Sequence, residues 1–286
     1  MAINTMKRLV PIILLCFAFI ECGFASEPSP KSECYDYWDV NYPLNGNVRY
    51  IQQTKVHYIA TANEVTHVQN SWINLIRFNA KGNLTKVYSY DASDDGSFEK
   101  KTCKYKYKYD KQNNLIYASD WIYAFGRAKY VYDSKGQIIK EKDISIDNEE
   151  VYVYNDNGYL ESSFQYGKGE SEPFCTHKYD EWCNIIESKF SDNFFPPCTW
   201  EYKYGENGRV LEIRKFEDKK MVEHRKYQYD ENGNNERVNC YDADGRHTIT
   251  IENMYDQNNN LIVVKIIHHK GVIDDVYLTI NEIHYK

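Results

Sequence analysis

The chain of 286 residues is 42% hydrophobic and 27% charged, a composition typical of a folded protein and not of a disordered or collagen-like one. Its formal net charge of −7 argues against binding a nucleic-acid backbone through overall electrostatic attraction. It contains 27 tyrosines. Because aromatic side chains favour strands, this enrichment indicates a protein rich in β-structure.

The N-terminus has the pattern of a secretory signal peptide. Lys7 and Arg8 precede an almost wholly apolar run, residues 9–20, which is too short to cross a bilayer as a helix. Small residues then mark a cleavage site after Ala25. We therefore expect residues 1–25 to be removed and the mature chain, without a transmembrane span, to be exported to the periplasm, the cell surface or the medium.

A lipid anchor on Cys22 is the alternative, which the preceding Glu21 disfavours because lipoprotein signals have a small residue there. Beyond the signal, an even number of cysteines remains, which permits disulfides in an oxidising compartment. These are Cys34, Cys103, Cys175, Cys183, Cys198 and Cys240. No two of them have the Cys-x-x-Cys spacing of a structural zinc site, so we expect neither a metal nor another cofactor.

Residues 26–75 form an N-terminal segment with a degenerate first repeat, and residues 76–286 continue the same domain with regular repeats. In the regular part, Tyr-x-Tyr-Asp/Asn followed by an Asn/Gly turn and an aliphatic residue recurs about every 25 residues. Residues 130–138 and 152–160 are clear copies. A fixed period of this length indicates one supersecondary unit that is used many times.

Each copy has the pattern of a strand, a tight turn and a return strand. Lys and Tyr alternate in residues 104–109, which is the period of a half-buried strand. The Asp, Asn and Gly that follow favour a turn, since Asp bonds backbone amides two residues on and Gly accepts a positive φ. A looser turn, such as Asp244-Gly245, separates the units.

The sequence therefore predicts an all-β fold: a repetitive antiparallel β-meander of about nineteen short strands. An open sheet of so many strands does not stay flat, so we expect a coiled or rolled open sheet. The repeated tyrosines should stack in register on its covered face as a structural ladder. They are Tyr109, Tyr132, Tyr154, Tyr179, Tyr204, Tyr229 and Tyr255.

The Tyr-Asp-x-x-Gly-Asn/Arg-Leu pattern resembles the YD repeats of the RHS family, and residues 241–246 read like the YDxxGR core of that family. The resemblance covers residues 35–286. It implies the antiparallel repeat sheet and the export setting of that family, but no activity. We expect a short, repeat-only protein, without the core region, protease motif and toxin domain found in the family.

Two tryptophans are candidate ligand contacts, because Trp121 and Trp182 stand outside the repeated tyrosine positions. Trp182 falls in a predicted turn, where an exposed indole can stack on a sugar ring. Packing over a neighbouring hairpin is the alternative for both residues.

Cys175 and Cys198 are a candidate disulfide, since each follows a Pro-containing connection and precedes the Tyr strand of its unit. One strand is expected between them, which separates them by about 9.6 Å in a regular sheet. That exceeds the roughly 7 Å reach of a disulfide, so buried thiols without a bridge are the alternative.

No motif predicts catalysis. Residues 91–96 resemble the first half of a calcium loop, but Thr102 stands where the loop requires Glu. His268 and His269 are neighbours in a predicted strand, so they face opposite sides and cannot hold one ion together. No nucleophile elbow or phosphate-binding loop occurs in the sequence, and we expect no enzymatic activity.

These observations predict an exported, non-catalytic β-repeat scaffold that binds a protein or glycan partner as a monomer. A carbohydrate-binding cell-surface protein is the first alternative, and it would present a row of exposed aromatic side chains. A component of an RHS-like toxin or immunity system is the second, and it would have a cognate partner encoded nearby. A glycoside hydrolase is a third, since paired carboxylates are common in the sequence.

Overall fold

The computed structural model describes residues 44–61, 64–91, 102–120, 127–144, 148–166, 173–191 and 196–285. Within them the chain forms eighteen β-strands and no helix, so the prediction of an all-β protein is confirmed. No helix in these ranges is long and apolar enough to cross a membrane. The predicted signal peptide, Trp121, Cys34 and residues 26–43 of the N-terminal segment lie outside the described residues.

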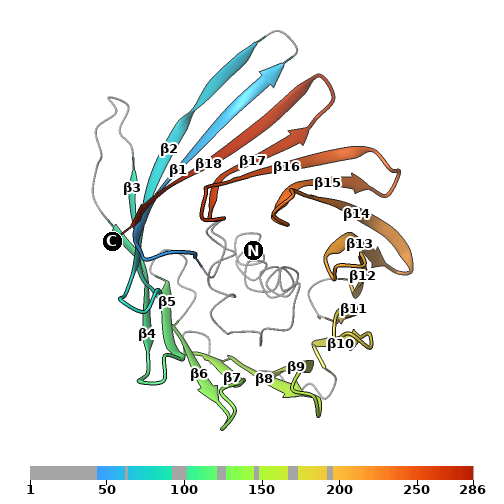
Figure 1. The fold of residues 1–286 in the computed structure, drawn as a ribbon. Coiled ribbons are helices and arrows are strands. Elements are labelled where there is room, and N and C mark those ends of the chain that lie inside the picture. Colours follow the sequence, from blue (N-terminus) through green and yellow to red (C-terminus); the bar gives the residue numbers. More distant parts are fainter. Residues whose placement is uncertain are drawn as a thin grey trace. The chain divides into compact units, whose positions relative to one another are not determined.

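The strands follow one another in chain order (Figure 1). They are β1 (Val48–Thr61), β2 (Val65–Phe78), β3 (Leu84–Asp91), β4 (Thr102–Tyr109), β5 (Leu115–Asp120), β6 (Arg127–Tyr132), β7 (Ile138–Asp143), β8 (Asn148–Tyr154), β9 (Leu160–Tyr166), β10 (Cys175–Tyr179), β11 (Ile185–Phe190), β12 (Cys198–Tyr204), β13 (Val210–Glu217), β14 (Lys220–Tyr229), β15 (Asn235–Asp242), β16 (His247–Tyr255), β17 (Leu261–His269) and β18 (Ile273–Tyr285).

All eighteen strands belong to one sheet, and the chain divides into two compact units. The first unit includes residues 108–226, in which β5 to β14 pair antiparallel, each strand with the next in sequence. The second unit includes residues 31–107, 227–241 and 246–286. Its antiparallel order is β15-β16-β17-β18-β1-β2-β3-β4.

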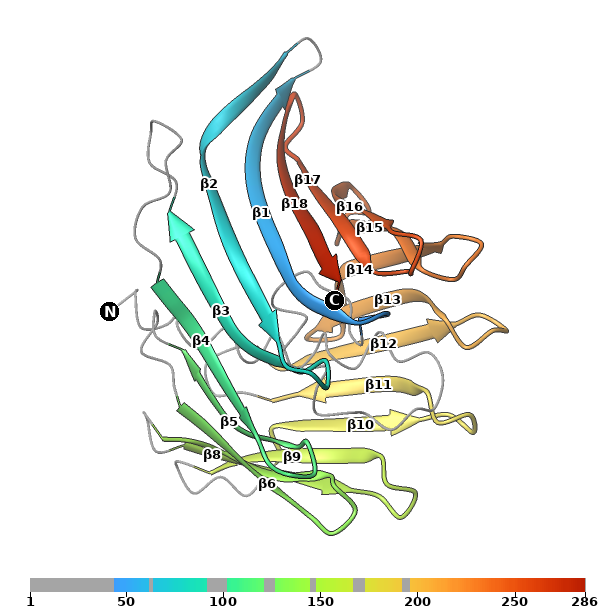
Figure 2. The same ribbon diagram turned by 60° about the vertical axis from the view of Figure 1, so that its left-hand side comes forward.

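The expectation of an open, coiled or rolled sheet is wrong, because the first strand pairs with the last. β1 is hydrogen-bonded to β2 on one side and to β18 on the other, in a register that runs from Val48 opposite Tyr285 to Thr61 opposite Ile273 (Figure 2). An open sheet would leave both of these long strands with unpaired backbone groups at an edge. Their pairing, which we call the closure, satisfies those groups.

Most of the tight turns share one hydrogen-bonding pattern that the repeated Asp and Asn residues dictate, although the turn that begins at Gly205 has no such side chain. Asp133 Oδ1 accepts the backbone N–H groups of Lys135 and Gln137, both at 2.8 Å, and Gly136 has a φ of +84°. The register of the hairpin shifts by one residue at Tyr132. This combination of a side-chain-stabilised turn and a bulge bends each hairpin in the same way. The same oxygen contacts occur at Asn79, Asn155, Asp180 and Asp256.

The repeated tyrosines link neighbouring hairpins through their hydroxyl groups. Tyr204 Oη donates to the backbone carbonyl of Ile185, the first residue of the preceding return strand, at 2.9 Å. We call this contact the tyrosine latch. It recurs from Tyr132 to Leu115, from Tyr154 to Ile138, from Tyr179 to Leu160 and from Tyr255 to Asn235. Tyr109 and Tyr229 of the predicted ladder are half-buried, like the others.

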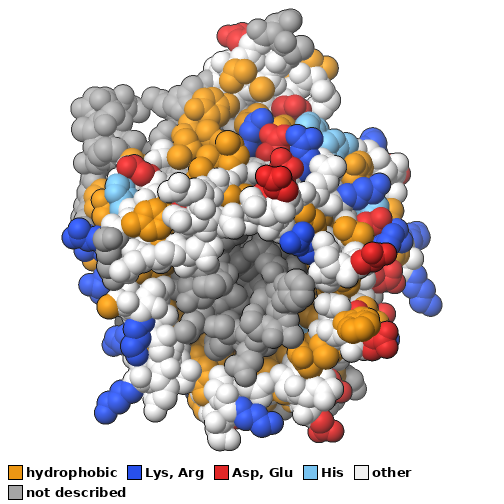
Figure 3. Space-filling view, in the orientation of Figure 1, with side chains coloured by type: hydrophobic (Ala, Val, Ile, Leu, Met, Phe, Trp, Pro, Cys, Tyr) orange, Lys and Arg blue, Asp and Glu red, His pale blue; other side chains and the backbone are white. Residues whose placement is uncertain are grey.

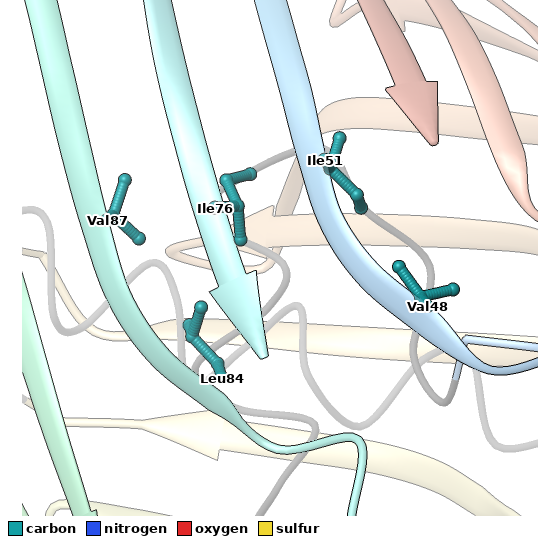
Figure 4. Close-up of a cluster of buried hydrophobic side chains, with 5 residues drawn as sticks. All are labelled: Val48, Ile51, Ile76, Leu84 and Val87. Atoms are coloured by element: carbon teal, nitrogen blue, oxygen red, sulfur yellow. The ribbon is translucent and has the colours of Figure 1, made fainter. Parts of the chain in front are cut away.

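The second unit contains the main aliphatic cluster, formed by Val48 and Ile51 of β1, Ile76 of β2, and Leu84 and Val87 of β3 (Figure 4). Ile51, Leu84 and Val87 are fully buried. Large apolar side chains on three adjacent strands exclude water from this face, which is the main favourable contribution to folding here.

A buried polar ladder lies on the same face of the second unit. Asn74 Nδ2 donates to Gln53 Oε1 at 3.0 Å, and Gln53 Nε2 donates to Asn281 Oδ1 at 3.1 Å. Ser89 Oγ donates to Asn74 Oδ1 at 2.7 Å. The contacts cross β18, β1, β2 and β3, so the hydrogen bonds of these amides depend on the pairing of β1 with β18.

Candidate ligand-binding site

The return strand is the second strand of each hairpin, and its fourth residue is apolar and buried in some repeats but polar in others. In β3, β13, β15 and β17 this residue is a buried aliphatic side chain: Val87, Ile213, Val238 and Val264. In three successive return strands, β7, β9 and β11, it is Glu141, Ser163 or Ser188. The first unit therefore replaces core-forming side chains by polar ones over one continuous region of the sheet.

Strand pairing brings further polar residues to this region. Ser163 lies opposite Tyr152 of β8 and Cys175 of β10. Ser188 lies opposite His177 of β10 and Trp200 of β12. Residues two apart on a strand face the same side, so both rows belong to one face. We call this group the polar cluster. Its members are Glu141, Glu150, Tyr152, Ser163, Cys175, His177 and Ser188.

A thiol, an imidazole and a hydroxyl are in contact within the polar cluster. Cys175 Sγ lies 3.3 Å from His177 Nε2, and His177 Nδ1 lies 2.8 Å from Ser188 Oγ. The three residues are 4%, 9% and 1% exposed. Burial lowers the pKa of His177 to about 4, because the charged imidazolium is poorly solvated there. The imidazole is therefore neutral at pH 7 and does not form the imidazolium–thiolate pair that activates cysteine nucleophiles.

Two carboxyl groups lie opposite each other at the other side of the cluster. Glu141 of β7 pairs directly with Glu150 of β8, and Tyr152 Oη donates to Glu141 Oε2 at 3.3 Å. Burial raises the pKa of Glu150 to about 7, because the carboxylate form loses its hydration. Near neutral pH, Glu150 can therefore accept a hydrogen bond in one form and donate one in the other.

Two buried oxygen atoms of the cluster, Glu150 Oε1 and Ser163 Oγ, make no well-aligned hydrogen bond within the described residues, although Ser163 and Tyr152 lie close enough to Glu150 to stabilise its carboxylate form. Ser163 is only 1% exposed. Buried polar atoms in folded proteins are nearly always paired, so such atoms mark a place where a ligand or an ordered water contributes the partner. The cluster can thus offer hydrogen bonds to a polar ligand.

The opposite face of the first unit is a surface of ion pairs. Lys178 Nζ lies 2.9 Å from Glu187 Oε1, and Arg214 Nη2 lies 2.8 Å from Glu212 Oε2. Lys and Arg side chains lie next to Asp and Glu side chains at the upper right of Figure 3. Exposed pairs of this kind contribute little stability, roughly 0–1 kcal/mol each. They keep this face of the first unit polar.

The structure places Trp182 away from the polar cluster, in the turn between β10 and β11, where its side chain is 76% exposed. Its backbone N–H donates to Asp180 Oδ1 at 2.9 Å, which fixes the turn and not the indole. The indole is thus presented to solvent on a defined turn. The other predicted ligand contact, Trp121, lies outside the described residues.

Cys175 and Cys198 lie on either side of Phe190, which pairs with both across β11. Their thiols are not bonded to each other in the structure. The intervening strand separates them, as the spacing of a regular sheet requires. Cys175 belongs instead to the polar cluster, and burial raises the pKa of the half-buried Cys198 thiol.

Sequence reasoning missed the polar cluster, although a signal for it is present. His177 occupies the position that Tyr130, Tyr152 and Tyr202 hold in other repeats, two residues before the latch tyrosine. Aligning the return strands by their first residue would also have revealed Ser163 and Ser188. Among the described residues, no group of three or more His, Cys, Asp or Glu side chains is arranged to hold a metal ion.

No family profile matches the sequence, and no curated protein is significantly similar to it. Among solved structures, TcdB2-TccC3-TEV is similar at 11% identity, with a TM-score of 0.33, over 73% of this chain and 15% of that one. A porin-like protein from Bacteroides uniformis is similar at 9% identity and a TM-score of 0.43, over 84% of this chain and 99% of that one. A DUF1329 family protein from Desulfovibrio piger is similar at 8% identity and a TM-score of 0.24, over 84% and 86%. This chain thus spans 15% of the length of TcdB2-TccC3-TEV.

Proposed function

We propose that the protein is an exported, non-catalytic β-repeat binding protein whose polar cluster holds a glycan. The observation that carries the proposal is the replacement of the buried aliphatic residue by Glu141, Ser163 and Ser188 in three successive return strands. Polar side chains at buried positions lower stability unless they are paired, so their concentration in one region favours a binding role. The signal-peptide pattern of residues 1–25 supports export.

The chemistry of the cluster favours binding over catalysis. His177 is neutral at pH 7 because burial lowers its pKa to about 4, so the contact with Cys175 lacks the charge that would generate a thiolate. The Glu150 and Ser163 oxygens that lack a well-aligned hydrogen bond can accept one from a ligand. A sugar supplies hydroxyl donors for them, and the hydroxyl group of Tyr152, which donates to Glu141, is a further polar group beside them.

Binding is tested on a glycan array followed by titration calorimetry of the best ligand. We expect the substitutions Ser163→Ala and Glu150→Gln each to weaken the affinity at least about tenfold, since each removes one buried hydrogen bond to the ligand. Ser162→Ala is the matched control, because the adjacent Ser162 is also buried but faces the opposite side of β9. Equal affinities of all three variants and the wild type would contradict the proposed site.

A surface site at Trp182 is a second candidate, which its 76% exposure favours. An exposed indole on a fixed turn can stack on a sugar ring. Trp182→Ala should then abolish glycan binding while Leu211→Ala, which truncates another exposed apolar side chain, leaves it intact. A result in which only the Ser163 and Glu150 variants lose binding excludes this second site.

A further inference from the structure

Four side chains of the second unit converge on the face of the sheet opposite the aliphatic cluster. His247 and Thr250 come from β16, His269 ends β17, and Asp274 lies directly opposite His269 on β18. His268, the neighbour of His269, faces the other side, where its ring meets Tyr277 edge-on. The partner of His269 is thus not the adjacent histidine in sequence but His247 on the neighbouring strand.

Both imidazoles direct the same ring nitrogen at one point. His247 Nε2 lies 3.0 Å and His269 Nε2 lies 2.9 Å from the hydroxyl oxygen of Thr250. His247 Nε2 also lies 3.1 Å from the backbone carbonyl oxygen of Ile249, to which it donates. The ring centroids are 4.5 Å apart. Two nitrogens that both contact a single oxygen are close enough for one ion to bond both after small side-chain rotations, since metal–imidazole bonds are about 2.0–2.1 Å long.

Asp274 fixes the orientation of one of these rings. Its Oδ2 lies 3.3 Å from His269 Nδ1. A carboxylate oxygen accepts hydrogen bonds, so Nδ1 carries the proton and the lone pair of Nε2 points towards Thr250. A carboxylate behind the distal nitrogen is the arrangement that orients histidine ligands in metal sites.

We propose that His247 and His269 bind one divalent late transition-metal ion, Cu²⁺ or Zn²⁺, through their Nε2 atoms, with Asp274 as a positioning residue. Imidazole nitrogen is the ligand that these ions prefer, whereas Ca²⁺ and Mg²⁺ prefer oxygen. The protein supplies two nitrogens, and water completes the coordination because His247 is exposed. Binding exchanges the two contacts with the Thr250 hydroxyl and the contact of His247 Nε2 with the Ile249 carbonyl for two bonds to the ion. The proton on His247 Nε2 moves to Nδ1, since only an unprotonated imidazole nitrogen can bond a metal.

The site is tested by calorimetric titration of the full mature chain with Cu²⁺, and separately with Zn²⁺ and Ca²⁺. We expect one Cu²⁺ or Zn²⁺ site that the double substitution His247→Ala/His269→Ala removes, and no response of this site to Ca²⁺. His268→Ala is the matched control and should bind as the wild type does, because His268 lies on the opposite face. Asp274→Asn should weaken binding about 10- to 100-fold, the usual effect of removing a carboxylate behind a histidine ligand.

Electron paramagnetic resonance of the Cu²⁺ complex gives a second readout. The wild type and His268→Ala should show nitrogen hyperfine coupling that the double variant lacks, and circular dichroism should show that all variants remain folded. Undiminished binding by the double variant would overturn the proposal, as would an equal loss in His268→Ala. Neither result would bear on glycan binding at the polar cluster, which involves other residues in the first unit.

Discussion

Burial shifts the pKa values of two side chains in the polar cluster in opposite directions. The pKa of Glu150 is raised to about 7 and that of His177 is lowered to about 4, because in both cases burial removes the water that would solvate the charged form. The two shifts oppose each other in their effect on stability. Substituting one residue at a time should therefore reveal a pH dependence that the wild-type protein largely hides.

Glu150 should destabilise the folded protein as the pH rises. Its pKa is raised above the ordinary value of 4.5, so the folded state binds the proton more tightly, and the free energy of unfolding falls between pH 4.5 and about 7. Relative to Glu150→Gln, we expect the wild type to lose up to about 3 kcal/mol between pH 5 and pH 8 in urea titrations. Glu149→Gln is the control, since Lys140 holds the pKa of Glu149 low on the opposite face. If the free energy of unfolding depended on pH in the same way for the wild type and Glu150→Gln, the burial of this carboxyl group would be refuted.

His177 should have the reverse effect. Its pKa is lowered below the ordinary value of 6.5, so its contribution to stability is complete above pH 6.5 and is lost as the pH falls towards 4. The substitution His177→Tyr introduces the residue of the other repeats and removes this titration. Between pH 8 and pH 5 we expect the wild type to lose about 2 kcal/mol more than the variant. His224→Tyr on the ion-paired face is the control, and a similar change in both variants would contradict the prediction.

At the scale of the hairpin, local turn chemistry and contacts with the neighbouring hairpin stabilise the same elements. The side-chain oxygen of the Asp or Asn residue closes the turn, and a residue near the end of the turn must have a positive φ. The tyrosine latch joins each hairpin to the return strand of the preceding hairpin. Each hairpin is thus stable only with its neighbour, which is the usual energetics of repeat proteins. Substitutions at the turn position with a positive φ test how much the backbone conformation of the turn contributes to stability.

Cys183 and Gly208 occupy this position in successive turns, with φ values of +65° and +74°. A side chain there is strained by about 1 kcal/mol, because its Cβ crowds the backbone. Cys183→Gly should therefore stabilise the protein by about 1 kcal/mol, and Gly208→Ala should destabilise it by a similar amount. No atom lies within 4 Å of the Cβ that Gly208→Ala adds, so only the backbone angle is tested. Thermal unfolding that moves in the same direction for both variants would disprove this account.

The strands and turns could be predicted from the sequence because their causes are local. Alternation in residues 104–109 and the Asx-Gly signals specify each hairpin without reference to the rest of the chain. The tyrosine latch was missed because its acceptor is a backbone carbonyl, which any residue can supply. The contact of Cys175 and His177 with the polar face of β9 and β11 was missed because register between strands sets it.

At the scale of the whole molecule, the pairing of β1 with β18 is the feature that the sequence did not predict. Neither strand contains the Tyr-x-Tyr-Asp motif. The two strands are also far apart in the sequence, so no local pattern indicates that they pair. Thr279 lies opposite Lys55 of β1 and Val264 of β17, in the middle of β18. Thr279 is therefore a suitable position at which to test how much the pairing of β1 with β18 contributes to the stability of the protein.

Thr279→Pro should destabilise the protein by about 3 kcal/mol or more, because proline removes a backbone donor and fits poorly in a central strand. Thr279→Val keeps the backbone donor and should cost less than half as much in the same urea titration. Equal unfolding midpoints for the proline variant and the wild type would show that the closure contributes nothing. An effect of equal size in both variants would assign it to the side chain.

The pairing of β1 with β18 also determines the order in which strand pairs can form during synthesis. β1 is synthesised first and β18 last, and the contact of Gln53 with Asn281 joins residues 228 positions apart. Hairpins can form one after another as the chain emerges, since each needs only its predecessor, but β1 cannot complete its pairing until β18 has been synthesised. Contacts between such distant residues form late, because ordering the intervening chain costs entropy before they are made. A chain that stalls before residue 273 leaves β1 as an exposed edge, so the nascent protein is most prone to aggregation before β18 has been synthesised.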